Sequence, residues 1–232
     1  MKPKKQIRVL LHVIAVMFLT GIGVATAQER VVVIPLMSDC SEVATVTSAG
    51  GQVWMDRNLG AFRVAQSVDD YQAYGWLYQW GRLADGHEVR SSPTTTNLSS
   101  RDIPGHGDFI TTSLSPYDWH DEQNDNLWQG VAGTNNPCPA GFRLPTETEW
   151  ESERASWSSN DAAGAFASPL KLVLAGYRST GSGTYGDSGS HGYYWSSTLD
   201  DIDAVHLYFW RNGAEMPSEY RAHGFSVRCI KD

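Results

Sequence analysis

Apolar and polar residues alternate in short runs along the chain after residue 43, a pattern typical of short β-strands. A β-rich run at 44–48, a turn at 49–51 and a second run at 52–55 together predict a hairpin. Residues 73–80 carry an aromatic ring at every second position, which predicts a strand with one buried aromatic face. These rings are Tyr74, Trp76, Tyr78 and Trp80.

The last third of the chain continues this pattern. Residues 193–198 and 225–230 predict strands, and a loop rich in Gly and Ser occupies 180–190. In 204–211 the side chains alternate, and Asn212-Gly213 predicts a turn directly afterwards. One face of that strand is Val205, Leu207 and Phe209, and the other is His206, Tyr208 and Trp210.

One helix is well signalled at 147–156. Thr146 is placed to cap its first turn, and Glu149 three residues later completes a capping-box pattern. Trp150 is expected to anchor this helix on the sheet. Strands with one inserted helix predict an α+β domain around a mainly antiparallel sheet. The long stretch 81–137 has no sustained period, so we expect Trp119 and Trp128 to pack it.

The first 27 residues have the pattern of a secretory signal peptide: a basic start, an apolar run at 9–19, and the small-residue motif Ala25-Thr26-Ala27. A transmembrane anchor is the alternative, but the apolar run is short and no basic cluster follows it. We therefore expect an exported protein in the periplasm, on the cell surface or outside the cell. Residues 28–42 then form a lead-in, and 43–232 form one domain.

The charge balance excludes some partners. The leader holds four of the 18 Lys and Arg residues and no acid, so the remaining chain carries 14 basic and 26 acidic residues, a net charge of −12. Nucleic acids and anionic membranes both need a basic surface. Neither is expected as a partner, and no membrane insertion is expected once the leader is removed.

Three cysteines, Cys40, Cys138 and Cys229, would enter an oxidising compartment with such a leader. One disulfide is expected, and spacing alone leaves all three pairings open. No motif containing histidine surrounds any of the three, so a structural role is favoured over a catalytic one.

Five blocks in a fixed order resemble the Fibrobacter succinogenes major paralogous domain. Together they span roughly 45–232, and their order makes the resemblance specific, although any one block alone is weak. The blocks are Val53 to Gly60, Tyr74 to Trp80, Cys138 to Trp150, Gly192 to Thr198 and Gly224 to Ile230.

The blocks at 143–147 and 224–229 are also similar to the formylglycine-generating enzyme superfamily. The resemblance implies a C-type-lectin-like fold: a twisted antiparallel sheet, one or two flanking helices, and long loops that carry any binding site. Members of the paralogous-domain family are typically exported bacterial proteins of largely undefined activity. The resemblance therefore transfers no catalytic residues.

Formylglycine-generating enzymes use a pair of cysteines near the end of the domain, and this chain has only Cys229 there. The resemblance thus implies a binding protein and not an enzyme, with a degenerate oxidase as the weaker alternative. Because Cys138 and Cys229 lie in the family blocks and Cys40 lies in the lead-in, we expect a disulfide between Cys138 and Cys229.

A loop at 119–126 concentrates the oxygen ligands that calcium takes, with Asp121, Asn124 and Asp125 as the candidates. Its spacing departs from an EF-hand loop, and the sugar-binding signatures of C-type lectins are absent from the sequence. A solvated acidic loop, or one whose side chains cap turns, is the favoured interpretation. No cofactor is therefore assigned, and none of the histidines has metal-ligand spacing.

A second acidic cluster, Asp200, Asp201 and Asp203, follows the strand at 193–198. Paired carboxylates serve glycoside hydrolysis, but acids in a turn are more often simply solvated. We expect a recognition face within 178–192 and 199–221, and a function as a binding or adhesion domain for a glycan or surface ligand. A subunit of a cell-envelope complex that binds protein is the alternative. The candidate contacts are Tyr185, Asp200, Asp203, Trp210, Arg211 and Asn212.

Overall fold

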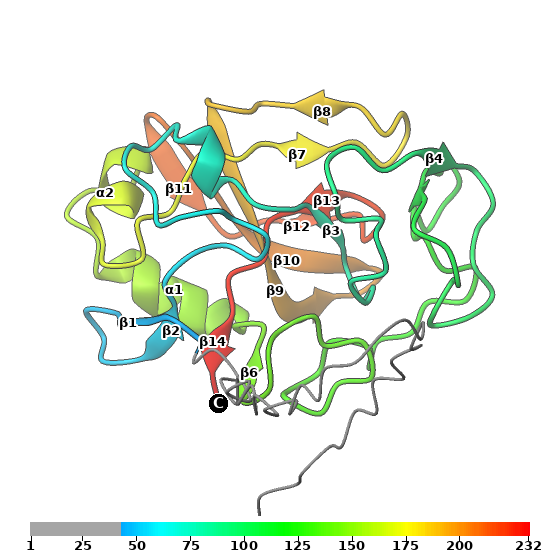
Figure 1. Ribbon diagram of the computed structural model, residues 1–232, viewed down its shortest axis with the longest axis horizontal. Coiled ribbons are helices and arrows are strands. Elements are labelled where there is room, and N and C mark those ends of the chain that lie inside the picture. The colour runs from blue at the N-terminus through cyan, green and yellow to red at the C-terminus, as the bar shows by residue number, and fades with distance from the viewer. Residues whose placement is uncertain (1–42) are drawn as a thin grey trace, which may run out of the picture. The chain divides into compact units, whose positions relative to one another are not determined.

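The computed structural model describes residues 43–232 (Figure 1). The expected leader, 1–27, and lead-in, 28–42, lie outside the described residues. Within the described part, four small sheets, two α-helices and one 3-10 helix confirm an α+β architecture with mainly antiparallel pairing. In 43–232 no helix is long and apolar enough to cross a membrane.

The first sheet joins the two ends of the described chain. Strands β1 and β2 form the predicted hairpin, with Val46 opposite Trp54. Strand β14 pairs with β2 on one side and with β6 on the other. The order is therefore β1 (Thr45–Thr47), β2 (Val53–Met55), β14 (Ile230–Lys231) and β6 (Phe142–Arg143).

The second sheet is built on two long neighbouring strands, β9 (His191–Asp200) and β10 (Asp203–Trp210). The alternation of β10 follows the prediction, because Leu207 and Phe209 join the core beneath the helices and the opposite face carries the polar aromatic residues. Strands β11 (Gly213–Glu215) and β12 (Ser218–Glu219) both pair with β10.

Two further sheets complete the described part. One has the order β3 (Tyr78–Gln79), β13 (Gly224–Phe225), β7 (Tyr177–Arg178) and β8 (Tyr185–Gly186). The other is the parallel pair β4 (Thr94–Thr95) and β5 (Phe109–Ile110). Strand β13 lies against β9, so this third sheet packs beside the second.

The predicted strand over 73–80 is mostly wrong. A 3-10 helix, η1 (Tyr71–Ala73), precedes it, and only Tyr78–Gln79 is a strand. Gly75 has φ of +69°, and a Cβ there would lie 2.3 Å from the carbonyl oxygen of Leu59. This left-handed residue interrupts the period of two, and Trp76 is 36% exposed as a result.

The predicted strand over 225–230 is also broken, into β13 and β14. Arg228 lies between them and is fully buried, with its guanidinium donating to the side-chain oxygen of Asn58 and to the carbonyl oxygen of Leu170. The backbone around Arg228 follows the position of these partners, so the residues between β13 and β14 do not continue the strand pairing. Burial lowers the pKa of Arg228 to about 10.

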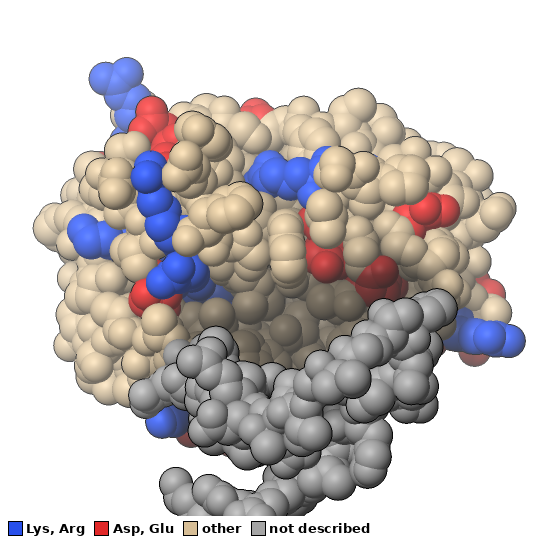
Figure 2. Space-filling view, viewed as in Figure 1, with Lys and Arg blue, Asp and Glu red and all other residues tan. Residues whose placement is uncertain are grey.

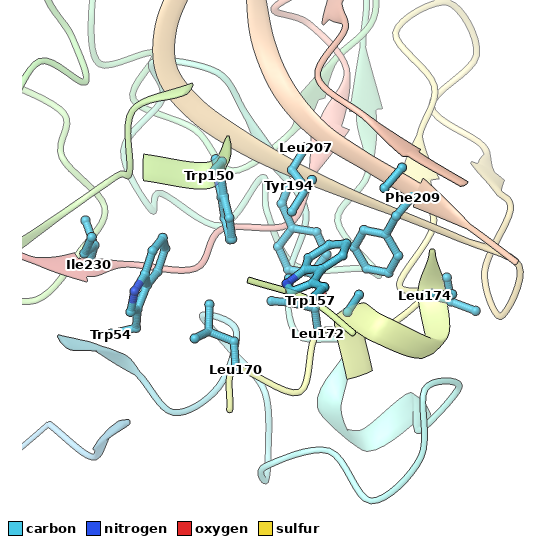
Figure 3. Close-up of a cluster of buried hydrophobic side chains, with 13 residues drawn as sticks. Trp54, Trp150, Trp157, Leu170, Leu172, Leu174, Tyr194, Leu207, Phe209 and Ile230 are labelled. Atoms are coloured by element: carbon cyan, nitrogen blue, oxygen red, sulfur yellow. The ribbon is translucent and has the colours of Figure 1, made fainter. Parts of the chain in front are cut away.

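Helix α1 (Glu147–Ala155) begins where the sequence predicts. The hydroxyl of Thr146 accepts from the Glu149 amide, and the Glu149 carboxylate accepts from the Thr146 amide, so the capping box is complete. Trp150 is fully buried and its ring lies 4.9 Å from that of Trp54. Figure 3 shows these rings in the core between the helices and the β9–β10 sheet.

Helix α2 (Ala162–Ala167) has no clear signal in the sequence. The Asp161 side chain caps it by accepting from the Gly164 amide. A Cβ at Gly164 would lie 1.9 Å from the carbonyl oxygen of Ser159, so this turn needs glycine. With Ala162 and Ala165 facing the core, α2 covers the same face of β10 as α1.

Buried aromatic rings order the long stretch 81–137. Trp119 donates its ring N–H to the carbonyl oxygen of Trp80 at 2.7 Å, and Trp128 donates to Asn135 at 2.9 Å. The prediction that packed tryptophans hold this stretch is confirmed. Its far end is fixed by the expected disulfide between Cys138 and Cys229, which is present.

Candidate functional site

Aromatic side chains line the face of β9 and β10 that points away from the helices. The register places Tyr208 opposite Tyr193 and Trp210 opposite His191, and directly opposed residues project from the same face of a sheet. The ring of Tyr208 lies 5.0 Å from that of Trp210, 4.8 Å from Tyr193 and 5.6 Å from His191, centroid to centroid. All four side chains are half-buried.

The row of rings continues across β13. Phe225 lies 5.0 Å from Tyr193 and 4.7 Å from His206, and both Phe225 and His206 are 1% exposed. Beyond them, His223 lies 5.6 Å from Phe225. We call the whole row the aromatic strip: Trp210, Tyr208, His191, Tyr193, His206, Phe225, His223, Tyr220 and Tyr117. Its two ends are half-exposed and its middle is buried.

Burial keeps three side chains of the strip, Tyr193, Tyr208 and His206, uncharged near pH 7. Burial, and then the neighbouring Asp187, raise the pKa of Tyr193, whose hydroxyl donates to that carboxylate at 2.7 Å. Burial also raises the pKa of Tyr208. Burial, reinforced by the charge of His223, lowers the pKa of His206 to about 3. These three residues therefore offer uncharged rings and phenol hydroxyls.

A groove of about 520 Å³ lies at the Trp210 end of the strip. We call it the Trp210 groove. Segments far apart in the sequence form it: the loop before η1, the start of α2, the segment before β9 and the end of β10. Its lining residues are Val68, Ala162, Ala163, Leu174, Gly189, Ser190, His191, Trp210 and Arg211.

Three of the six predicted contacts lie together at this end. Trp210 and Arg211 line the groove, and Asn212 follows them in the exposed turn between β10 and β11. Tyr185 lies on β8, where its hydroxyl is held by the carbonyl oxygen of Arg90. The arginine and the tryptophan are therefore the predicted residues that share one concave surface.

Asp200 and Asp203 lie at the other end of the β9–β10 hairpin. Asp203 and Trp210 are seven residues apart on one strand, about 23 Å at the rise of an extended chain. Asp200 accepts from the Ser218 hydroxyl at 2.8 Å. Burial, and then repulsion from Glu219 and Asp200, raise the pKa of Asp203. The structure does not bring these acids to the Trp210 groove.

The candidate calcium ligands are engaged with protein groups. Asp125 forms an ion pair of 2.8 Å with Arg221. Asn124 donates its amide to Asp102 at 3.0 Å and accepts from the backbone of Asn126 at 3.0 Å. The side-chain oxygen of Asn124 caps a turn by accepting from the Asn126 N–H. The Arg221 guanidinium occupies the place beside Asp125 that a cation would take.

Asp121 lies 3.6 Å from the Nδ1 atom of His120. His120, Asp102 and Asn124 line a shallow pocket of about 410 Å³ beside this loop. Arg101 lines the same pocket, so a cation there would meet an arginine as well as acids.

A buried cluster that the sequence analysis did not foresee contains Asp85, His87 and Glu88. The Nε2 atom of His87 accepts from the backbone N–H of Gln79 at 3.1 Å. Its Nδ1 atom lies 2.8 Å from the carboxylate oxygen Oδ1 of Asp85. Burial lowers the pKa of His87 to about 4, so the ring is neutral and Nδ1 carries its one proton. A metal at Nδ1 would put that proton on Nε2, against the Gln79 N–H. The cluster fits a hydrogen-bonded network, completed by Arg82, and not a metal centre.

Several strip residues were missed at the sequence level. Tyr208 could have been predicted as a strip residue from the alternation within 204–211, because it shares one face of that strand with His206 and Trp210. Tyr193 and His223 join the strip only through strand pairing and the packing of β13 against β9. No pattern within one segment could find them.

No family model, no curated protein and no solved structure matches the chain. The aromatic strip and the Trp210 groove are therefore the features from which a function can be inferred.

Proposed function

We propose that the protein is an exported binding domain of the Fibrobacter succinogenes major paralogous type, with a lectin-like fold, and that it binds a glycan along the aromatic strip. The half-exposed rings of Trp210, Tyr208 and Tyr193 carry this proposal. The face of an aromatic ring is electron-rich, and it attracts the weakly positive C–H groups on the flat side of a sugar.

The polar groups beside the rings suit the same ligand. Tyr208 carries a hydroxyl at the exposed end, and Asp187 accepts from Tyr193 while its carboxylate stays 41% exposed. Such groups exchange hydrogen bonds with sugar hydroxyls, and the rings supply the contact area. On the face shown in Figure 2, uncharged surface predominates and charged side chains stand singly or in small groups. The proposed role is binding without catalysis.

The test is a glycan array followed by titration of tryptophan fluorescence with free sugar as competitor. We expect Tyr208→Ala to weaken glycan binding at least about tenfold, which corresponds to about 1.4 kcal/mol. Tyr71→Ala is the matched control, because Tyr71 is 74% exposed and lies outside the strip. Equal glycan affinity of Tyr208→Ala and the original protein would show that the strip is not the binding surface.

A role as a subunit of a cell-envelope complex is the second candidate, favoured by a separate observation. Phe62 is 88% exposed and Tyr71 is 74% exposed. The Phe62 amide donates to the carbonyl oxygen of Gln72 at 3.0 Å, so a hydrogen bond joins the Phe62 loop to η1, which carries Tyr71. Exposed aromatic residues of this size are typical of protein contacts.

Phe62→Ala with Tyr71→Ala tests this second candidate by co-purification from the cell envelope. Loss of a defined envelope protein from the double variant, with glycan binding unchanged, would assign these loops to assembly. Retention of every envelope partner by the double variant would remove the candidate.

A further inference from the structure

The Trp210 groove contains an arginine without a protein partner. Among residues 43–232, the guanidinium groups of nine arginines donate hydrogen bonds to carboxylates, amides, hydroxyls or backbone carbonyls. Among the same residues, the guanidinium groups of Arg211 and Arg101 make no hydrogen bond or ion pair. Arg211 is exposed at the rim of the groove. Its five N–H donors are therefore free for a ligand.

No acidic residue lines the groove. The acids on the segments that form it have partners of their own. Asp161 accepts from the Ser159 hydroxyl and the Gly164 amide, and Asp187 accepts from the Tyr193 hydroxyl. Arg211 is the charged side chain that lines the groove, and its guanidinium favours an anionic ligand.

The rest of the groove is apolar on one side and carries an acceptor on the other. Val68 and Leu174 contribute aliphatic surface next to Trp210. The Ser190 hydroxyl donates to the carbonyl oxygen of Asp187 at 2.9 Å, so it accepts the proton of His191 Nδ1, also at 2.9 Å. In the tautomer with its proton on Nδ1, the Nε2 atom of His191 is an acceptor suited to a hydroxyl of the ligand.

These features match one kind of ligand. We propose that the Trp210 groove binds a carboxylate-bearing sugar unit, such as a uronic or sialic acid, with its carboxylate on Arg211 and its C–H face on Trp210. The proposal rests on the proposed function, because it names the sugar class at one end of the aromatic strip. A guanidinium binds a carboxylate through two parallel hydrogen bonds, which a neutral sugar cannot form. The groove volume of about 520 Å³ lies in the range of small-ligand sites.

The test compares acidic glycans with neutral forms of the same glycans. The probes are an oligogalacturonate with its methyl ester, and sialyllactose with lactose, titrated against the full chain. We expect the acidic form of at least one pair to bind about tenfold tighter. This preference should shrink as the salt concentration rises from about 0.05 to 0.5 M, because salt screens exposed charges.

Arg211→Gln keeps a polar side chain at an exposed position and removes the charge. We expect it to abolish the preference for the acidic form and to leave the affinity for the neutral form unchanged. Arg101→Gln is the matched control, since it removes the other unpartnered guanidinium and should keep the preference.

Each outcome separates this inference from the proposed function. Neutral and acidic forms that bind equally, with binding lost in Tyr208→Ala, would overturn the acidic-sugar proposal and leave glycan binding in place. An Arg211→Gln variant that keeps the preference would also overturn it. Binding of carboxylate-bearing peptides in place of sugars would do the same, and binding of no glycan of either form would overturn both proposals.

Discussion

His206 occupies the middle of the aromatic strip and is 1% exposed. Its ring contacts Tyr193, Trp195 and Phe225, and its Nδ1 atom has no hydrogen-bond partner among the described residues. A proton on this ring would be desolvated and would face the second ring of His223. His206 is therefore neutral in the folded protein. Because protonating it in the fold is unfavourable, the stability of the fold depends on pH.

Acid is expected to destabilise the fold through this residue. The unfolded chain binds a proton at His206 below about pH 6.5, and the folded chain binds it only at about pH 3. The free energy of unfolding should fall by about 1.4 kcal/mol per pH unit as the pH is lowered between these values. Urea unfolding at pH 7, 6, 5 and 4 measures this slope.

His206→Phe should lower this slope by about 1.4 kcal/mol per pH unit, because phenylalanine fills the same aromatic contacts without a titrating group. His87, whose pKa burial also lowers, keeps its own contribution. His106→Phe, at a histidine that is 38% exposed, is the control and should leave the slope unchanged. An identical slope for His206→Phe and the original protein would contradict the buried neutral state.

At the scale of the single element, α1 is fixed by its first turn. Thr146 and Glu149 exchange three hydrogen bonds, and the Glu149 carboxylate also receives two from Arg143 at 2.8 Å each. Arg143 in turn belongs to β6. The start of the helix is thereby attached to the sheet that holds both ends of the described chain.

Thr146→Ala should lower the free energy of unfolding by about 1 kcal/mol, because the amide of Glu149 loses its capping acceptor. Thermal or urea unfolding measures this. Thr148→Ala, on the exposed side of the same helix, is the control and should leave stability unchanged or slightly higher. Equal losses in the two variants would show that the cap contributes nothing.

The elements that sequence predicts well have local causes. The capping box of α1, the hairpin of β1 and β2, and the alternation of β10 each depend on neighbouring residues, and all three are confirmed. The failures have distant causes. At Gly75 the backbone is left-handed and passes close to the carbonyl oxygen of Leu59, which is distant in sequence. The predicted strand over 225–230 is interrupted at Arg228, whose guanidinium donates to the side-chain oxygen of Asn58.

The candidate site divides in the same way. Trp210 and Arg211 are adjacent in sequence, so a prediction that named one loop could include both. The groove also needs Val68, Leu174 and α2, and no periodicity in the chain relates these segments to β10. The strip depends on register between β9 and β10, which sets Tyr193 beside Tyr208.

At the scale of the whole molecule, the disulfide joins Cys138 to Cys229 across 91 residues of sequence. A closed loop of this length restricts the unfolded chain, and its loss should cost about 4 kcal/mol. The double variant Cys138→Ala, Cys229→Ala should unfold at correspondingly lower urea concentration. Reduction should destabilise the original protein to a similar extent and leave the double variant unaffected. Superimposable urea curves for the oxidised protein and the double variant would contradict the expected loss.

The pairing of β2 with β14 has a mechanical consequence. The chain enters and leaves the described fold through one small sheet, and Figure 1 shows β7, β8 and β11 at the opposite side of it. A pull between residues 43 and 232 would be transmitted across the hydrogen bonds of that sheet. Strands β9 and β10 lie outside this route, so such a pull would leave the aromatic strip undisturbed until the terminal strands part.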